Sequence, residues 1–242
     1  MSMAGTREAG LNTPDGFLLS VIIPVYNERS TVAELLSRVR AVDIPKELII
    51  VDDYSSDGTW EMLTEEAGCS DVRLFRHHRN LGKGGAVRTG LAQVRGDVVL
   101  IQDADLEYDP RDYPALLRPI LEGRAEAVYG SRFLGEHKAM LFWHAVGNKL
   151  LTLVTNVLYD STLTDMETCY KVFTRTIADG LDIKQLRWGI DPEITAKILR
   201  QGVRIYEVPI AYNGREAWEG KKISWKDGFV VLSTLLRYRF VR

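Results

Sequence analysis

Short apolar runs alternate with amphipathic segments along the first half of the chain. Continuous apolar residues bounded by polar ones predict buried strands at about 18–23, 47–53, 72–77 and 97–103. Apolar residues at helical spacing predict helices within 32–39, 55–67 and 82–94. A strand–helix alternation of this kind predicts an α/β fold with a doubly wound, mainly parallel sheet and flanking helices.

The pattern changes after about residue 135. Apolar residues from Val146 to Leu158 follow helical spacing, 203–212 is typical of a strand, and 225–242 mixes apolar and basic residues as an amphipathic helix does. We therefore expect one domain over 18–242, with a first half at 18–134 and a second half at 135–242. Residues 1–17 are expected to form a disordered leader.

The composition narrows the function classes. A net charge of −2 and a charged fraction of 26% exclude a disordered composition and an overall basic surface for nucleic acid. Cys69 and Cys169 lie far apart, so neither a disulfide framework nor a CxxC site is predicted, and a cytosolic setting is expected. Residues 139–159 are apolar, but Lys149 lies among them, where a charge costs roughly 2.5–3.5 kcal/mol in a membrane, so no span is predicted.

Acidic residues crowd the end of the last predicted strand in the first half. Asp103, Asp105, Glu107 and Asp109 stand at every second position, and would share one face if the strand continued. Carboxylates held this close repel one another unless one is protonated or a cation lies between them. A hard divalent ion, Mg²⁺ or Mn²⁺, would answer that need and also hold substrate phosphates. The alternative is a solvated acidic turn, and Asp109, followed by Pro110, is predicted to cap the next helix.

A glycine-rich segment at 80–90 has two interpretations. It lacks the GxxxxGK[ST] pattern of a P-loop, and Val87 stands at the last glycine position of a GxGxxG fingerprint. It is either a tight turn that caps a helix or a contact with the diphosphate or sugar of a donor.

Five segments, in this order, resemble glycosyltransferase family 2: VIIPVYNE (21–28), IIVDDYSSDGT (49–59), NLGKGGAVRTG (80–90), DADLEYDP (103–110) and VYGSRF (128–133). The nearest branch is that of the polyprenyl-phosphate (dolichol-phosphate) sugar synthases. The resemblance is strong over roughly 18–134 and looser over 160–225. It implies a GT-A fold, a UDP- or GDP-linked sugar donor, Mg²⁺ or Mn²⁺, and transfer of a hexose with inversion to a polyprenyl phosphate.

The resemblance also implies roles for individual residues. Nucleotide-sugar binding is implied for Pro24, Tyr26, Glu28, Val51, Asp53, Lys83, Asp103, Ala104 and Asp105. Asp105 and Glu107 are the implied metal ligands, although this branch often has Gln where Glu107 stands. Catalytic roles are implied for Asp105, Arg132, Asp165, Arg215 and Lys222. The acceptor phosphate is assigned to Arg132, Arg215, Lys221 and Lys222, and the spacing after Arg215 leaves the two lysines as alternatives for one role.

A phosphate acceptor would remove the need for a general base. An alcohol must lose a proton as it attacks, whereas a phosphate monoester, with a second pKa near ~6, is already anionic. If the acceptor were an alcohol, Asp165 or, less favourably, Glu167 is the base to expect.

A lipid acceptor would also give the apolar helices a role. A basic amphipathic helix can lie in an anionic membrane interface, so we expect peripheral association with the cytoplasmic face of a membrane. Core packing, a contact with a second copy, or a membrane-protein partner are the alternatives for these helices.

Two other functions stay open. A soluble family 2 transferase acting on a saccharide or protein hydroxyl would share the first half, and so would a non-catalytic subunit that binds an NDP-sugar. A processive polysaccharide synthase is disfavoured, because QLRW at 185–188 is one residue short of QxxRW and no span is predicted. The donor base, the sugar and the lipid length are left undecided.

Overall fold

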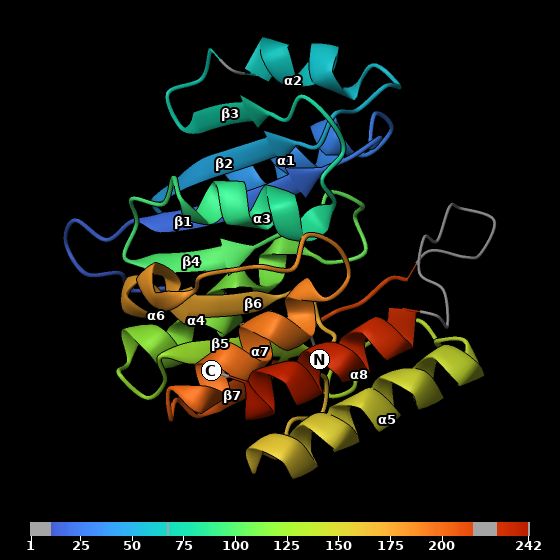
Figure 1. Cartoon of the computed structure of the whole chain (residues 1–242). Helices are drawn as coiled ribbons and strands as arrows, with labels where there is room; N and C mark the ends of the chain where they lie inside the picture. Colours follow the sequence, from blue (N-terminus) through green and yellow to red (C-terminus); the bar gives the residue numbers. More distant parts are fainter. Residues whose placement is uncertain (1–10, 67, 215–226, 242) are drawn as a thin grey trace, which may run out of the picture.

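The computed structural model describes residues 11–66, 68–214 and 227–241 (Figure 1). The strands are β1 Leu19–Val25, β2 Lys46–Asp52, β3 Val72–Arg76, β4 Val98–Ile101, β5 Ala127–Ser131, β6 Lys171–Thr174 and β7 Ile205–Pro209. The helices are α1 Val32–Ala41, α2 Thr59–Glu66, α3 Lys83–Leu91, α4 Tyr113–Leu121, α5 Phe142–Tyr159, α6 Arg175–Gly180, α7 Ile190–Arg200 and α8 Asp227–Phe240. The strands and helices expected in the first half are therefore present.

All of these strands belong to one sheet, in the order β3-β2-β1-β4-β6-β5-β7. The pairings β1–β2, β2–β3, β1–β4 and β5–β7 are parallel, and β6 is antiparallel to both β4 and β5. From β1 the chain continues to β2 and β3 on one side of β1, and it then crosses to β4 on the other side. In a doubly wound sheet, ligands bind at the carboxyl ends of the strands beside such a switch point.

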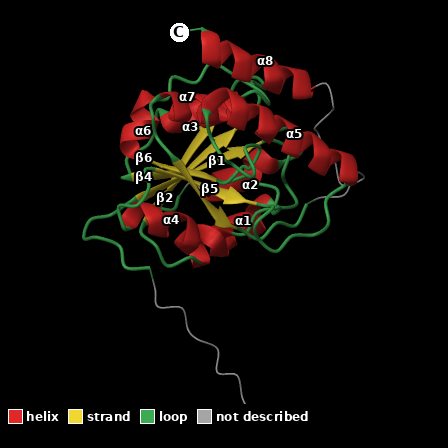
Figure 2. Ribbon diagram, turned by 90° about the horizontal axis from the view of Figure 1, so that it is seen from below, coloured by secondary structure: helices red, strands yellow, loops and turns green. Residues whose placement is uncertain are grey.

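Helices cover both faces of the sheet, with α1 and α4 on one and α3, α6 and α7 on the other (Figure 2). Because both faces are covered, β1 and the middle of β2, at 48–51, are almost continuously apolar and buried. Phe17 is 7% exposed and belongs to this core, and Leu11 packs against it. The core therefore begins inside the segment expected to be a leader, of which 1–10 lie outside the described residues.

A second, smaller core lies between α5, α7 and α8. Its members come from these helices and from the segment after α5: Tyr159, Leu163, Met166, Ala196, Val231 and Leu235. The hydroxyl of Tyr159 donates a hydrogen bond to the backbone oxygen of Leu235 at 2.7 Å. Figures 1 and 2 both show α8 lying along α5 on the outer side of α7, away from the sheet.

One side of α5 is apolar and exposed. We call Val146, Leu150, Leu153 and Val157 the α5 apolar face, and their exposed fractions run from 39% to 77%. The opposite side, with Thr152, Thr155 and Tyr159, is buried. Core packing, one interpretation of this helix, is therefore wrong for these four residues. No helix in the described part of the chain has the length and apolar character needed to cross a membrane.

Candidate active site at the carboxyl ends of the strands

The acidic segment after β4 is a turn, not a strand. β4 ends at Ile101, and Leu106 adopts a left-handed backbone conformation with φ of 62°. The acids therefore do not share one face of a strand, as the alternation alone suggested. The capping role predicted for Asp109 is confirmed, because its side chain accepts a hydrogen bond from the backbone N–H of Arg111 at 2.9 Å, at the start of the turn that leads into α4.

Asp103 is paired with Lys83, the first residue of α3. The ammonium nitrogen lies 3.0 Å from Oδ1 of Asp103 and also donates to Sγ of Cys169 at 2.8 Å. Burial opposes the charge on Lys83, but Asp103, Cys169 and Asp191 together outweigh it and hold the pKa of Lys83 well above its usual value. The two residues assigned to the nucleotide are thus brought together by α3 and β4, with the lysine protonated.

Asp105 and Glu107 lie on the same turn, where the N–H of Glu107 donates to Oδ1 of Asp105 at 3.1 Å. Sequence reasoning missed Tyr212, whose hydroxyl donates to Oε2 of Glu107 at 2.7 Å. The backbone N–H of Asn213 donates to the backbone oxygen of Glu107 at 2.9 Å, and Tyr108 forms an isolated β-bridge with Tyr212. The acidic turn is therefore joined to the segment that precedes the predicted phosphate-binding loop.

A divalent ion fits this turn if a substrate completes its ligands. The described residues contain no group of three or more acidic, histidine or cysteine side chains able to hold a metal ion by themselves. Mg²⁺ and Mn²⁺ are commonly bound through one or two carboxylates together with substrate phosphates. Asp105 and Glu107 match that pattern, and their assignment as ligands stays a prediction.

The glycine-rich segment packs against the chain at 185–187. A Cβ on Gly84 would lie 2.2 Å from the backbone oxygen of Gln185, and one on Gly82, where φ is 92°, would lie 2.6 Å from that of Leu186. The N–H of Gly85 donates to the same oxygen of Leu186 at 3.0 Å. Close approach of two backbones thus explains these glycines without a ligand, a reason that the sequence did not predict.

Asp53 holds this segment in place. Its carboxylate accepts hydrogen bonds from the N–H groups of Leu81 at 2.8 Å and Gly82 at 2.6 Å, and lies 2.6 Å from Nδ1 of His77. Its side chain is therefore already well supplied with donors, and its predicted contact with the base stays a prediction.

The other nucleotide residues differ in access. Tyr26 is 37% exposed at the end of β1, and Pro24 and Glu28 are half-buried beside it. Val51 is fully buried in β2, and Ala104 is 4% exposed. The burial of Val51 leaves its predicted place beside the base a prediction.

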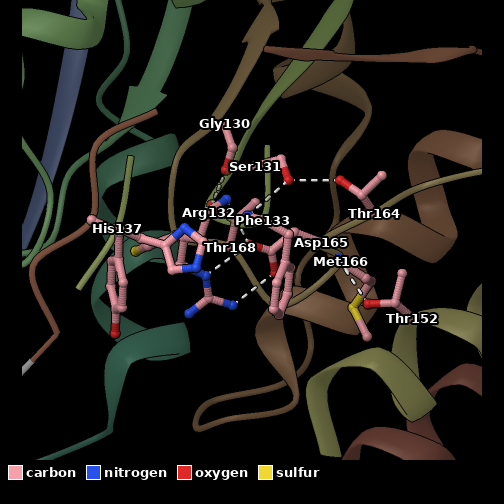
Figure 3. Close-up of polar contacts among 12 residues, drawn as sticks. Gly130, Ser131, Arg132, Phe133, His137, Thr152, Thr164, Asp165, Met166 and Thr168 are labelled. Atoms are coloured by element: carbon pink, nitrogen blue, oxygen red, sulfur yellow. Dashed lines mark hydrogen bonds and ion pairs between the residues drawn. The ribbon is translucent and has the colours of Figure 1, made fainter. Parts of the chain in front are cut away.

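Arg132 and Asp165 form a buried bidentate pair (Figure 3). Nε and Nη2 of Arg132 each donate to an oxygen of Asp165 at 2.7 Å, and the backbone N–H of Arg132 donates at 3.0 Å. Asp165 is fully buried, and the guanidinium of Arg132 lies 5.2 Å from the ring of Tyr212. The residue expected to bind phosphate and the residue expected near the acceptor therefore hold each other.

A second buried pair lies nearby and was not predicted. Nζ of Lys171, which is fully buried, donates to Oδ1 of Asp191 at 2.7 Å and to the backbone oxygen of Met166 at 3.1 Å. Lys171 opens β6 and Asp191 lies in the first turn of α7. A lysine directly before the apolar residues of a strand is the only sequence signal for it. Arg215, Lys221 and Lys222 lie outside the described residues.

Several known proteins resemble this chain in sequence. A family model described as glycosyl transferase family 2 matches residues 20–181. A dolichol-phosphate mannosyltransferase of Pyrococcus furiosus is 29% identical over 84% of this chain, which spans 58% of that relative. A dolichyl-phosphate beta-glucosyltransferase of Trichomonas vaginalis is 28% identical over 90% of this chain and 72% of its own length.

A solved structure shares the fold. The crystal structure of glucosyl-3-phosphoglycerate synthase from Mycobacterium tuberculosis, in complex with Mn²⁺, UDP and phosphoglyceric acid, superposes with a TM-score of 0.70. The sequences are 21% identical, and the match covers 94% of this chain and 80% of that one. At this identity the likeness shows the fold alone.

Proposed function

The chain belongs to glycosyltransferase family 2 and has the GT-A fold, and from this premise we propose that it moves a hexose from a UDP- or GDP-linked donor to a polyprenyl phosphate, with inversion. The chain is a glycosyltransferase by family. The lipid acceptor is supported by the names of the relatives in Pyrococcus and Trichomonas, which act on dolichol phosphate.

The nucleotide-sugar is assigned to the switch point of the sheet. Tyr26 at the end of β1 and the Lys83–Asp103 pair beside β4 lie where doubly wound sheets bind ligands. Lys83 is protonated and offers its charge to an anionic diphosphate. The structural neighbour that holds UDP and Mn²⁺ supports this placement through its fold.

A divalent ion would be held by Asp105 and Glu107. When bound, it supplies Lewis-acid stabilisation of the charge that develops on the departing NDP. Tyr212 orients Glu107 through the hydrogen bond from its hydroxyl. This chain's contribution is to hold the two carboxylates on one turn, close in sequence to Asp103, the partner of Lys83.

The observation that best supports a phosphate acceptor is that Asp165 is buried and hydrogen-bonded to Arg132. Its two oxygens accept hydrogen bonds from Arg132, and it is fully buried, so it is poorly placed to take a proton from an alcohol. A phosphate monoester needs no such base. The guanidinium of Arg132 has more N–H donors than Asp165 uses, and we assign the rest, with Arg215 and Lys221 or Lys222, to the acceptor phosphate.

A membrane surface is proposed to lie against α5 and α8. The α5 apolar face is exposed, and α8 adds exposed Phe229 and Phe240 together with the cationic Arg237 and Arg239. Apolar side chains with basic neighbours suit the interface of an anionic membrane, where a polyprenyl chain is anchored. Association with the cytoplasmic face of that membrane follows from this proposal.

Release of NDP tests the reaction. The protein is mixed with UDP- and GDP-linked hexoses, Mn²⁺ and a polyprenyl phosphate, and we expect NDP to be released only when donor, acceptor and metal are all present. Asp105→Ala should lower the rate by at least about hundredfold. Asp109→Asn, on the same turn but with a capping role, is the matched control. Undiminished turnover by Asp105→Ala with the metal removed would contradict the metal assignment.

A hydroxyl acceptor is the second candidate, because one carboxyl group near the site has a pKa suited to a general base. Burial and the negative charge of Asp191 raise the pKa of Glu167 to about 7, where a general base works best near neutral pH. Screening saccharides and peptides against polyprenyl phosphate separates the two acceptors.

A further inference from the structure

Glu167 occupies the middle of a tightly held loop between α5 and β6. Each of its neighbours in the loop makes a hydrogen bond to another part of the molecule. Figure 3 shows those of Asp165, Met166 and Thr168. The bonds join Thr164 to Glu207, Asp165 to Arg132, Met166 to Thr152, Thr168 to Gly130, and Cys169 to Tyr108. The position of Glu167 is therefore fixed by the residues on either side of it.

The ion pairs around this loop are each complete without Glu167, and Glu207 is a further acid beside it. Three ion pairs lie around this loop: Lys83–Asp103, Arg132–Asp165 and Lys171–Asp191. Each pair is neutral, so Glu167 is an additional acid. Burial and the negative charge of Asp191 disfavour its ionised form, only partly offset by Lys171 and Arg132, and its pKa is raised to about 7.

Folding leaves one oxygen of this carboxyl group without a hydrogen-bond partner in the described part of the chain. Its Oε1 atom is enclosed and accepts no hydrogen bond within the part of the chain that the structure describes. Enclosing a polar atom without a partner costs free energy, and such groups call for an explanation beyond stability. A ligand that brings a hydrogen-bond donor to Glu167 would supply this explanation.

A carboxyl group suits only some parts of a nucleotide-sugar. An ionised carboxyl group would repel the diphosphate, whereas its oxygens accept hydrogen bonds from the hydroxyl groups of the sugar. Its place also fits the hexose. Cys169 contacts Lys83 on the nucleotide side at 2.8 Å, and Asp165 contacts Arg132 on the acceptor side at 2.7 Å. Glu167 lies between them in the loop, as the hexose lies between diphosphate and acceptor.

We propose that Glu167 accepts a hydrogen bond from a hydroxyl group of the donor hexose and thereby selects the sugar. The inference rests on the proposed function and deepens it, because it names the residue that distinguishes one hexose from another.

Calorimetry with Mn²⁺ tests it by comparing sugar nucleotides with free nucleotides. UDP-glucose, UDP-N-acetylglucosamine and GDP-mannose are titrated beside UDP and GDP. For the sugar nucleotide that the wild type binds most tightly, Glu167→Gln should weaken binding about tenfold, with the affinity for free nucleotide unchanged. Glu61→Gln, on the exposed side of α2, is the control and should change neither.

Deoxy analogues of that sugar identify the hydroxyl. Removing the hydroxyl that Glu167 binds should weaken binding to the wild type by the same factor and should cost Glu167→Gln nothing further. Because Oε1 of Glu167 has no partner to lose in the described part of the chain, the variant should melt at or above the temperature of the wild type. A clearly lower melting temperature would overturn the premise that this oxygen has no internal partner.

Other outcomes overturn the inference in distinguishable ways. Equal weakening of nucleotide and sugar nucleotide, or no weakening of either, removes the sugar contact and leaves the proposed function intact. Full affinity with turnover lowered at least about hundredfold would make Glu167 a general base instead. A wild type that binds none of these sugar nucleotides would overturn the proposed function as well.

Discussion

Helices α1 and α5 both carry apolar residues at helical spacing, but these residues are buried in α1 and exposed in α5. In α1 the apolar residues Val32, Leu35, Leu36 and Val39 are at most 1% exposed, because the sheet covers them. In α5 the apolar face is exposed, while the threonines on the other side are buried. Helical spacing therefore predicts the helix in both halves, but what covers its apolar side depends on the fold.

Acidic residues have two different roles in this molecule. Asp53 and Asp109 accept hydrogen bonds from backbone N–H groups and shape loops. Asp103, Asp165 and Asp191 neutralise cations that are largely buried. Loss of an acid of the second kind should cost more stability, because it would leave a buried charge unpaired.

Asp165→Ala should give the largest loss of stability. Without this carboxylate the buried guanidinium of Arg132 has lost its bidentate partner, which typically costs about 3–5 kcal/mol of unfolding free energy. Urea unfolding measures the loss. Asp179→Ala, which breaks the exposed pair with Arg175, is the control and should cost less than about 1 kcal/mol. Equal losses in the two variants would contradict the difference drawn between buried and exposed pairs.

The pH dependence of stability should change in Glu167→Gln. The pKa of Glu167 is raised from 4.5 to about 7 in the folded protein, so ionisation destabilises the fold as pH rises through that interval. Gln does not ionise, so the variant does not lose stability in this way. The difference in unfolding free energy between the variant and the wild type should therefore grow between pH 4.5 and 7, by up to about 3 kcal/mol in favour of the variant.

Urea unfolding at several pH values measures this advantage. Asp112, whose pKa is raised to about 6 by burial, titrates in the same range but is common to both proteins and cancels in the difference. A difference that does not vary with pH would mean that Glu167 ionises normally.

Gly84→Ala tests the contact between the halves. The added methyl carbon would meet the backbone oxygen of Gln185, and displacing that segment should cost about 1–3 kcal/mol. Gly147→Ala, in α5 with open space around the position, is the matched control and should stabilise by about 1 kcal/mol. Thermal unfolding distinguishes them, and a neutral Gly84→Ala would show that the two backbones can separate freely.

The double variant Leu150→Ser, Leu153→Ser tests the exposed face of α5. If this face lies against a membrane, binding to vesicles containing anionic lipid should weaken about tenfold, because two apolar side chains are lost. Tyr54→Ser, an exposed aromatic of the first half, should leave binding unchanged. Unchanged vesicle binding by the double variant, together with loss of a dimer, would assign the face to a second copy.

The sequence could predict what depends on neighbouring residues. The strands and helices as far as β4, the acids after β4 and the cap at Asp109 follow from local spacing. The pairs Arg132–Asp165 and Lys171–Asp191 could not be predicted from spacing, because the fold brings together residues far apart in the chain. The same is true of Gly84, whose reason is the backbone at Gln185, and of Tyr212, whose hydroxyl reaches Glu107 from the other half. β6 and α7 were missed because buried charges interrupt their apolar pattern.

Transfer to polyprenyl phosphate and to the matching polyprenol is the most direct test of the central claim. The two lipids differ only in the phosphate, and a donor labelled in its hexose shows transfer to either. With donor and Mn²⁺ present, we expect labelled lipid from polyprenyl phosphate and none from polyprenol. Transfer to polyprenol at a comparable rate, or transfer to neither lipid while a saccharide is labelled, would contradict the claim that the acceptor is a phosphate.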